Sequence, residues 1–283
     1  MNEISGLTRE TGIAILDKAA DIGLLTSHGG GYYTIHPALP WFFRSLFEQC
    51  YPEETPQLSD DPNRKSKIVN QKSAMRAFVE SMGALGNYYH NQYGDGNSNV
   101  IAPLRREEPN LLHARSLARK HGWWQAIINA MQGLQQLYNH TGRRAEWKRL
   151  VEEILPDFVG ADDLPLLGRE EQWDIVTQHR VLLAEESHNL AEAEQLQRVR
   201  VDWNRRRAAS LSARPAESLS TVEKNMLRTL AVSLGQLSDI QREQNKKECV
   251  EPSKEAIEIY HAIGDHAAEA IRCLLYTSKW RGY

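Results

Sequence analysis

Cysteine is scarce in this sequence of 283 residues, and its three copies, Cys50, Cys249 and Cys273, lie far apart. An odd number at this spacing fits neither a disulfide framework nor a paired-thiolate metal site, so we expect reduced thiols with a structural role. No apolar run approaches the roughly 18 residues of a membrane span, and the N-terminus lacks the pattern of a secretory signal. We therefore expect a cytoplasmic protein that does not enter a membrane.

Signatures of catalysis are missing too. The sequence contains no G-x-x-x-x-G-K-[ST] phosphate loop and no HExxH, and no serine-histidine-acid set or pair of catalytic carboxylates stands out. We predict that this chain is not an enzyme, binds no metal and holds no cofactor of its own. Its formal charge of −3 provides no general basic field, which argues against nucleic acid as a partner.

Residues 1–51 predict a small mixed module. Apolar side chains over Thr8–Ile22 recur at helical spacing, and Gly23 supplies the positive φ that often follows a helix. The segments LLTSH and YYTI flank three glycines, a pattern that predicts two strands joined by a turn. Pro37 then falls in the first turn of a helix over Pro37–Gln49, whose leucines and phenylalanines predict a buried face used for packing.

The remainder of the chain predicts helices. Residues 52–67 combine prolines and charges with almost no large apolar side chains, which predicts a linker. Over residues 68–272 we expect one helix at SAMRAFVESMGALGNYYHNQY, a break over Asp95–Leu104, and a second helix at NLLHARSLARKHG. Three antiparallel pairs follow: WWQAIINAMQGLQQLYNH with RRAEWKRLVEEIL, QWDIVTQHRVLLAEES with LAEAEQLQRVRVDWNRRRAASL, and NMLRTLAVSLGQLSDIQREQ with SKEAIEIYHAIG.

These pairs predict the fold class. Each pair is joined by a turn and carries apolar stripes that it cannot bury alone, so neighbouring pairs are expected to stack. The spacing of one pair resembles a tetratricopeptide repeat, and it is carried by Tyr138, Gly142, Trp147 and Ile154. SLGQL at residues 233–237 and AIEIY at 256–260 resemble the halves of another. We expect a mainly α protein, an α-solenoid of tetratricopeptide-like helix pairs after a small winged-helix (α+β) segment.

The N-terminal residues resemble a second family. ILDKAADIGLL, GGGYY and TIHPAL are similar to the winged-helix segment of STAND proteins, signalling ATPases that place a nucleotide-binding module ahead of a repeat sensor. LRREEPNLLHA, residues 104–114, is similar to the charged entry into their first repeats. The resemblance implies a fragment whose repeats bind a protein or peptide, and whose winged helix signals to a P-loop module outside this sequence. ATP or ADP would bind that module in the full-length parent.

His36 is the candidate site residue that the resemblance implies. STAND proteins carry a histidine at the hairpin-to-helix corner, within an apolar-His-Asp motif, and it contacts the bound diphosphate. Ile35 and His36 match the first two places, whereas Pro37 replaces the aspartate. An imidazole can donate a hydrogen bond to phosphate and gains charge near neutral pH. The alternative, that His36 only caps the helix or fills the corner, stays open.

Other patterns are assigned to the surface. Asp95–Asn99 begins like a calcium loop, but Val100 and Arg106 replace its turn glycine and its final acid. The basic stretch Arg198–Ala209 has glutamates nearby, which predicts a solvated repeat face rather than a nucleic-acid site. The alternative function is a free-standing helical-repeat adaptor, or a winged-helix transcriptional regulator that contacts DNA.

The last residues form a separate segment. CLLYTS, at the start of residues 273–283, is also one translation of a mosaic-end sequencing adapter, so we interpret this tail as non-native. A solenoid that stops there lacks a polar capping repeat and exposes an apolar end. We therefore expect self-association or fraying near Ile257–Leu275.

Overall fold

The computed structural model describes residues 7–36, 39–51, 70–211 and 214–278. Within these ranges the chain is mainly α, with eleven α-helices and a single two-stranded sheet. It divides into two compact units, residues 1–142 and 143–283. The predicted linker at residues 52–67 lies outside the described residues, as do Pro37 and the last five residues of the predicted tail. None of the described helices has both the length and the hydropathy that crossing a membrane requires.

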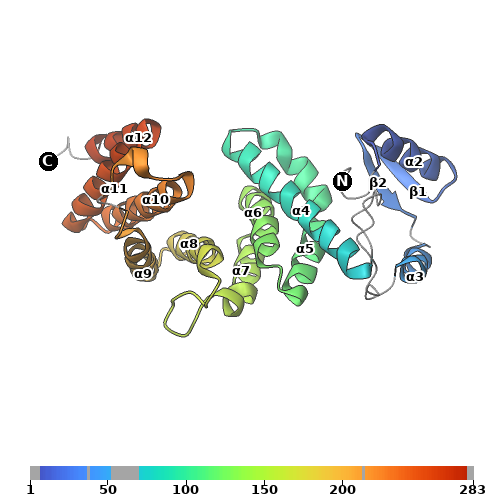
Figure 1. The fold of residues 1–283 in the computed structure, drawn as a ribbon, viewed down its shortest axis with the longest axis horizontal. Helices are drawn as coiled ribbons and strands as arrows, with labels where there is room; N and C mark the ends of the chain where they lie inside the picture. The colour runs from blue at the N-terminus through green and yellow to red at the C-terminus, as the bar shows by residue number, and fades with distance from the viewer. Residues whose placement is uncertain (1–6, 37–38, 52–69, 212–213, 279–283) are drawn as a thin grey trace. The chain divides into compact units, whose positions relative to one another are not determined.

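The first described elements are a helix, a hairpin and a second helix, as predicted (Figure 1). Their bounds are Arg9–Asp21 for α2, Leu25–Gly29 for β1, Tyr32–Ile35 for β2 and Pro40–Cys50 for α3. Thr8 caps α2, because its hydroxyl accepts a hydrogen bond from the N–H of Thr11 at 3.2 Å. The antiparallel register pairs Leu25 with Ile35. All three turn glycines have positive φ, between 61° and 82°, which explains why the sequence places glycine there.

The start of α3 differs from the prediction. The helix begins at Pro40 and not near Pro37, and Leu39 is its N-cap. Both prolines satisfy the rule that favours proline in the first helical turn, so the sequence alone could not choose between them. The consequence is that His36 lies outside the helix it was expected to border.

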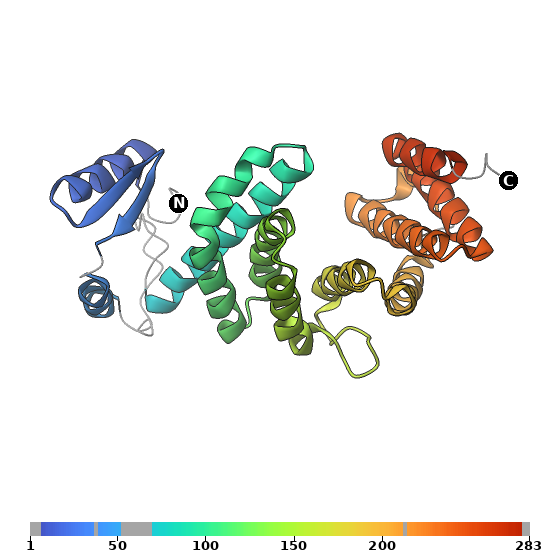
Figure 2. The same ribbon diagram turned by 180° about the vertical axis from the view of Figure 1, so that it is seen from behind.

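Three long helices complete the first unit. They are α4 (Gln71–Gly94), α5 (Ile101–His121) and α6 (Trp124–Thr141), with the short 3₁₀ helix η1 (Ser98–Val100) before α5. Asn70 and Ser73 cap α4 reciprocally: the N–H of Ser73 donates to the Asn70 side chain at 2.7 Å. In both views α4 and α6 lie side by side (Figures 1 and 2). Each helix packs on the other two, which buries the shared apolar stripe.

Two glycines allow α4 and α6 to approach each other closely. A Cβ added to Gly86 would lie 2.6 Å from the backbone oxygen of Asn129, and one added to Gly133 would lie 2.8 Å from the Cα of Gly86. Real Cβ atoms do not approach backbone atoms so closely, because van der Waals repulsion rises steeply. The crossing point of these helices therefore requires glycine on both sides.

The predicted break between α4 and α5 is too long, and the second helix starts earlier than expected. Only residues 95–97 separate α4 from η1, and α5 runs through Pro109. An internal proline costs a helix about 3 kcal/mol. Leu104 and Leu111, on either side of it, are both 0 % exposed, and burial of a leucine contributes about 1.5–3 kcal/mol. Tertiary packing therefore offsets the local penalty on which the prediction relied.

The second unit consists of helices that pack on their neighbours in sequence. They are α7 (Arg144–Phe158), α8 (Glu170–Glu186), α9 (Leu190–Ala208), α10 (Thr221–Glu243), α11 (Val250–Ile263) and α12 (His266–Ser278), with 3₁₀ helices η2 (Ala216–Ser218) and η3 (Lys247–Cys249). The predicted pairs α8 with α9 and α10 with α11 are confirmed, and α9 also packs on α10. The first predicted pair is not borne out, because α6 packs on α4 and α5 of the first unit, whereas α7 belongs to the second unit and packs on α8. Leu230, Leu234 and Tyr260 belong to the core that α10 and α11 share. This order of packing is what consecutive helix pairs require.

Candidate functional site

His36 stands at the end of the hairpin, and its side chain is exposed. Its N–H donates to the carbonyl of Leu24 at 3.1 Å, and its carbonyl accepts from the N–H of Leu39 at 2.9 Å. The backbone of His36 thus joins β2 to the turn that leads into α3. The alternative in which His36 caps this helix is wrong, since Leu39 occupies the N-cap. The imidazole stays a candidate phosphate ligand, and the aspartate position of the motif, Pro37, lies outside the described residues.

The aromatic face of α3 is exposed, contrary to the prediction of a buried helix. Trp41 is 71 % exposed, Phe42 45 % and Leu46 42 %. Trp41 and Phe42 meet edge to face, with ring centroids 6.2 Å apart. The apolar periodicity of the sequence shows that this face is suited to burial. It does not show which other surface would cover the face. Within the described residues, no side chain of α3 is buried.

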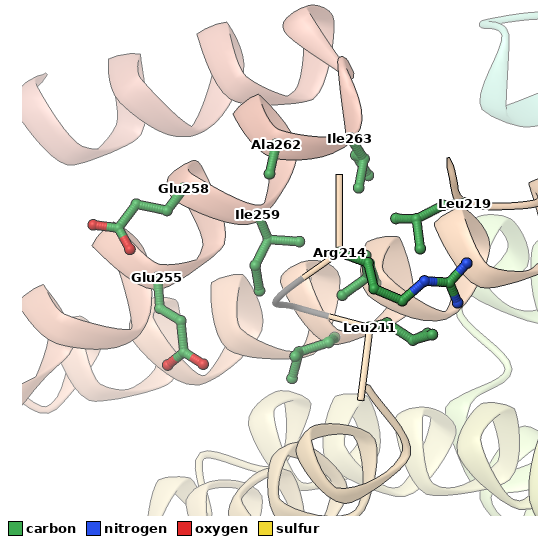
Figure 3. Close-up of a pocket in the computed structure, with 10 residues that line it drawn as sticks. Leu211, Arg214, Leu219, Glu255, Glu258, Ile259, Ala262 and Ile263 are labelled. Atoms are coloured by element: carbon green, nitrogen blue, oxygen red, sulfur yellow. The ribbon is translucent and has the colours of Figure 1, made fainter. Parts of the chain in front are cut away.

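A groove of about 310 Å³ lies beside α11 in the second unit (Figure 3). Its apolar lining comes from α10, from α11 and from the connection between α9 and α10, and comprises Leu211, Leu219, Leu227, Leu230, Ile259, Ala262 and Ile263. The four leucines are buried parts of the core, whereas Ile259 and Ile263 are only partly buried. The groove is therefore a place where the core of this unit reaches the surface.

Charged side chains border this groove asymmetrically. Glu255 and Glu258 project on one side of Ile259, and Arg214 lies on the other (Figure 3). Glu255 binds Arg205, with 3.1 Å between Nε and Oε1, and Arg214 donates to the carbonyl of Ser218 at 2.8 Å. Glu258 is exposed and, among the residues that the structure describes, pairs with no cation. Its carboxylate is the charge that this rim can offer to a ligand.

Beneath a second hollow, of about 380 Å³, lies a buried ion pair between α8 and α9. The side chain of Arg200 is 2 % exposed, and its Nε and second terminal nitrogen donate to the two oxygens of Asp174 at 2.8 and 2.7 Å. Asn204 donates to the same carboxylate at 2.9 Å, and Gln236 of α10 accepts from Arg200 at 2.5 Å. The predicted solvated arginine face is therefore wrong for Arg200. Its charge ties three helices together.

Two glutamates near α10 have pKa values displaced in opposite directions. Burial alone would raise the pKa of Glu194, but hydrogen bonds from Lys246, Gln241 and Arg198, with a weaker one from Gln244, lower it to about 2. Burial raises the pKa of Glu185 to about 7, and the carboxylates of Glu243, Asp239 and Glu186 add to the effect. Donors surround the first carboxylate, whereas acids surround the second. The two groups therefore give the unit opposite responses to pH.

Comparison with known proteins adds no relative to this picture, since no family model, no curated protein and no solved structure matches the chain. The structure and the sequence are thus the whole basis for a function. Sequence reasoning named His36 but missed Glu258 and the groove, because periodicity marks which residues are apolar and not where the apolar core reaches the surface. Glu255 and Glu258 could have indicated the acidic rim of the groove, because residues three apart on a helix share one face.

Proposed function

We propose that this chain is the winged-helix end and the tetratricopeptide-like repeat region of a STAND-type signalling protein. Its role is to bind a protein or peptide in the cytoplasm, and it performs no catalysis itself. The order of the elements supports this: a helix and hairpin come first, and helix pairs packed in succession follow. Tyr138, Trp147 and Ile154 of the repeat motif are all buried, with Gly142 in the left-handed conformation at the turn.

The repeat-like stretch SLGQL offers further support. A Cβ at Gly235 would collide with the guanidinium of Arg272, so glycine lets this side chain lie directly against α10. Arg272 passes this point and donates to both oxygens of Asp239 at 2.9 and 3.0 Å. A small residue on the first helix of one pair thus admits a side chain from a following helix. Close packing of this kind between one helix pair and the helix that follows it is what a repeat array needs.

The observation that carries the binding function is the groove beside α11. An apolar floor with one carboxylate rim fits a peptide segment that inserts an aliphatic or aromatic side chain and places a lysine or arginine near Glu258. Such a ligand would cover Ile259 and Ile263 and would pair the exposed carboxylate. Pairing of a basic ligand residue with Glu258 would fix the direction in which the peptide lies in the groove. The buried apolar side chain of the ligand would contribute the larger share of the binding free energy.

Selection from a library of displayed peptides, with the full chain as bait, tests this function. The selected peptides are expected to share an apolar anchor followed or preceded within one helical turn by a basic residue. Glu258→Lys should reverse the preference from basic to acidic residues, and Ala262→Trp should block the groove and weaken binding by more than about 10-fold. Glu251→Lys is the matched control, since this exposed glutamate is on α11 but does not line the groove. Peptides indifferent to both substitutions would refute the groove as the site.

Coupling to a nucleotide switch is the second half of the proposal. His36 would contact the diphosphate bound by a P-loop module of the full-length protein, and the winged helix would transmit occupancy of the repeats. Long-read sequencing of the gene beyond both ends of this frame tests it. Codons for a phosphate loop upstream support the switch, whereas a gene that starts at residue 1 removes the role of His36. The latter result would favour a free-standing repeat adaptor or a winged-helix regulator that binds DNA.

A further inference from the structure

The turn between α11 and α12 brings three metal-ligating side chains together. His261 is in the last turn of α11, His266 is the first residue of α12, and Glu269 follows one turn later. Each offers a ligand atom, and these atoms all lie within 4.8 Å of one another. No metal ligand is predicted from the sequence, because the three residues are separated by a glycine turn and form no familiar spacing. Folding of the turn is what assembles them.

The backbone holds this turn in a defined shape. Gly264 has φ of 76°, and the N–H of Asp265 donates to the carbonyl of Tyr260 at 2.9 Å. The side chain of Asp265 accepts from the N–H of Ala268 at 3.2 Å and pairs with Arg228 at 3.1 Å. The α-carbons of the three ligating residues are therefore held by hydrogen bonds that do not involve their own side chains. A bound ion would not have to build this turn.

The ligand atoms converge on Glu269. The Nδ1 atoms of His261 and His266 each lie 3.1 Å from a different oxygen of this carboxylate. A tetrahedral ion with ligands at about 2.0–2.1 Å separates them from one another by roughly 3.3 Å, which is close to both histidine–carboxylate distances. All the ligand atoms lie within 4.8 Å of one another, so rotation of the side chains is enough to bring them to one ion. Both imidazoles are mostly exposed, at 72 % and 76 %, so they can rotate to admit an ion, while Glu269 is 24 % exposed and anchors it.

We infer that His261, His266 and Glu269 form a binding site for a divalent transition-metal ion that links α11 to α12. Two imidazoles and one carboxylate suit Zn²⁺, Ni²⁺ or Cu²⁺, whereas Ca²⁺ and Mg²⁺ prefer sites made of oxygen alone. Three protein ligands leave a fourth position for water. Since His261 belongs to one helix and the other two ligands to the next, the ion closes a bridge across the turn. This site does not depend on the proposed peptide-binding function.

Zn²⁺ titration of the full chain, followed by NMR of the histidine ring carbons, tests the site. A Cys50→Ser background removes the exposed thiol, which could bind Zn²⁺ on its own. One equivalent should shift the resonances of His261 and His266 and leave the other imidazoles in place. Glu269→Gln keeps the size of the side chain but removes its charge, and it should weaken binding by more than about 10-fold. His28→Gln, in the hairpin, is the matched control and should bind as the parent does.

Hydrogen exchange provides the second measurement, because it reports the bridge and not only the ion. If the ion binds only when α12 is docked on α11, free Zn²⁺ at 100 times its dissociation constant should slow exchange in α12 by about 100-fold. Shifts spread over unrelated histidines, or no shift at about 1 mM Zn²⁺, would overturn the site. Binding that leaves exchange in α12 unchanged would overturn the bridge. An unchanged affinity in Glu269→Gln would exclude the carboxylate as a ligand.

Discussion

The buried pair of Arg200 and Asp174 gives the sharpest prediction for stability. Asp174→Asn keeps the shape of the side chain but leaves the guanidinium, which is 2 % exposed, without its counter-charge. Breaking a buried ion pair from one side costs about 3–5 kcal/mol, because the remaining charge stays desolvated. Asn204 would also lose a charged acceptor at 2.9 Å, although the new amide oxygen can still accept. We expect the second unit to lose about 3–5 kcal/mol of unfolding free energy.

A second substitution shows whether the lone charge is the cause. Arg200→Met combined with Asp174→Leu removes both charges and leaves only the polar groups of Asn204 and Gln236 without partners. Gln236 is only partly buried and can bond to water instead, so Asn204 is the one buried group of the two that is left unsatisfied. An unsatisfied buried polar group costs about 1–3 kcal/mol, so this double variant should be more stable than Asp174→Asn alone. Hydrogen exchange in peptides from α8 and α9 is the assay, because it measures opening of this unit by itself.

A double variant that is less stable than Asp174→Asn alone would contradict this prediction. That result would mean that the pair contributes net attraction and that desolvation of Arg200 is a minor cost. Asp202→Asn is the control, since this carboxylate is also on α9 but is 67 % exposed, at 3.8 Å from Arg205. Exposed pairs contribute about 0–1 kcal/mol, so the control should match the parent protein.

Three further substitutions have expected outcomes that thermal or urea unfolding can check. Gly86→Ala should destabilise the first unit by about 1–3 kcal/mol, because its Cβ would lie 2.6 Å from the oxygen of Asn129, whereas Gly94→Ala meets nothing within 4 Å and should not destabilise. Glu194→Gln should cost about 1.5–3 kcal/mol at pH 7, and the difference should vanish as the pH falls from about 4.5 towards the folded pKa of about 2. Glu185→Gln should be more stable than the parent at pH 8 by about 1 kcal/mol and equal to it below about pH 4.5, because stability is lost between the unfolded pKa of 4.5 and the folded pKa of about 7. A parent curve without opposite slopes in these two pH ranges would contradict both assignments.

Local signals explain which parts of the fold could be predicted. Thr8 caps a helix, three glycines close a hairpin, and Gly142 and Gly264 adopt the left-handed conformation that ends a helix. Each of these features depends on interactions within a few residues of sequence, so the sequence contains the whole cause. The bounds of the helices that follow such signals agree with the prediction within a few residues.

Features that depend on distant contacts could not be predicted in this way. Pro109 would end a helix by its local chemistry, yet burial of its neighbours keeps α5 continuous. Arg200 sits among exposed arginines in the sequence, and only the position of Asp174, 26 residues earlier, explains its burial. The apolar stripe of α3 predicts burial that the described residues do not supply. In each case the structure differs from the prediction because of a contact between distant residues, or the lack of one, and the periodicity of the sequence does not indicate such contacts.

Helix α11 shows how one amphipathic segment can serve three surfaces. Ala256 and Tyr260 face the core shared with α10, Ile259 and Ile263 line the groove, and His261 faces Glu269 of α12. Successive residues of a helix are 100° apart, so neighbouring positions necessarily belong to different surfaces. Glu258 lines the groove and Glu269 lies at the turn, so the charge of one can be changed while the other stays in place. If changing Glu258 weakens only peptide binding and changing Glu269 of α12 weakens only metal binding, the two proposed sites are separate although both include residues of α11, because neither substitution removes a residue of the core.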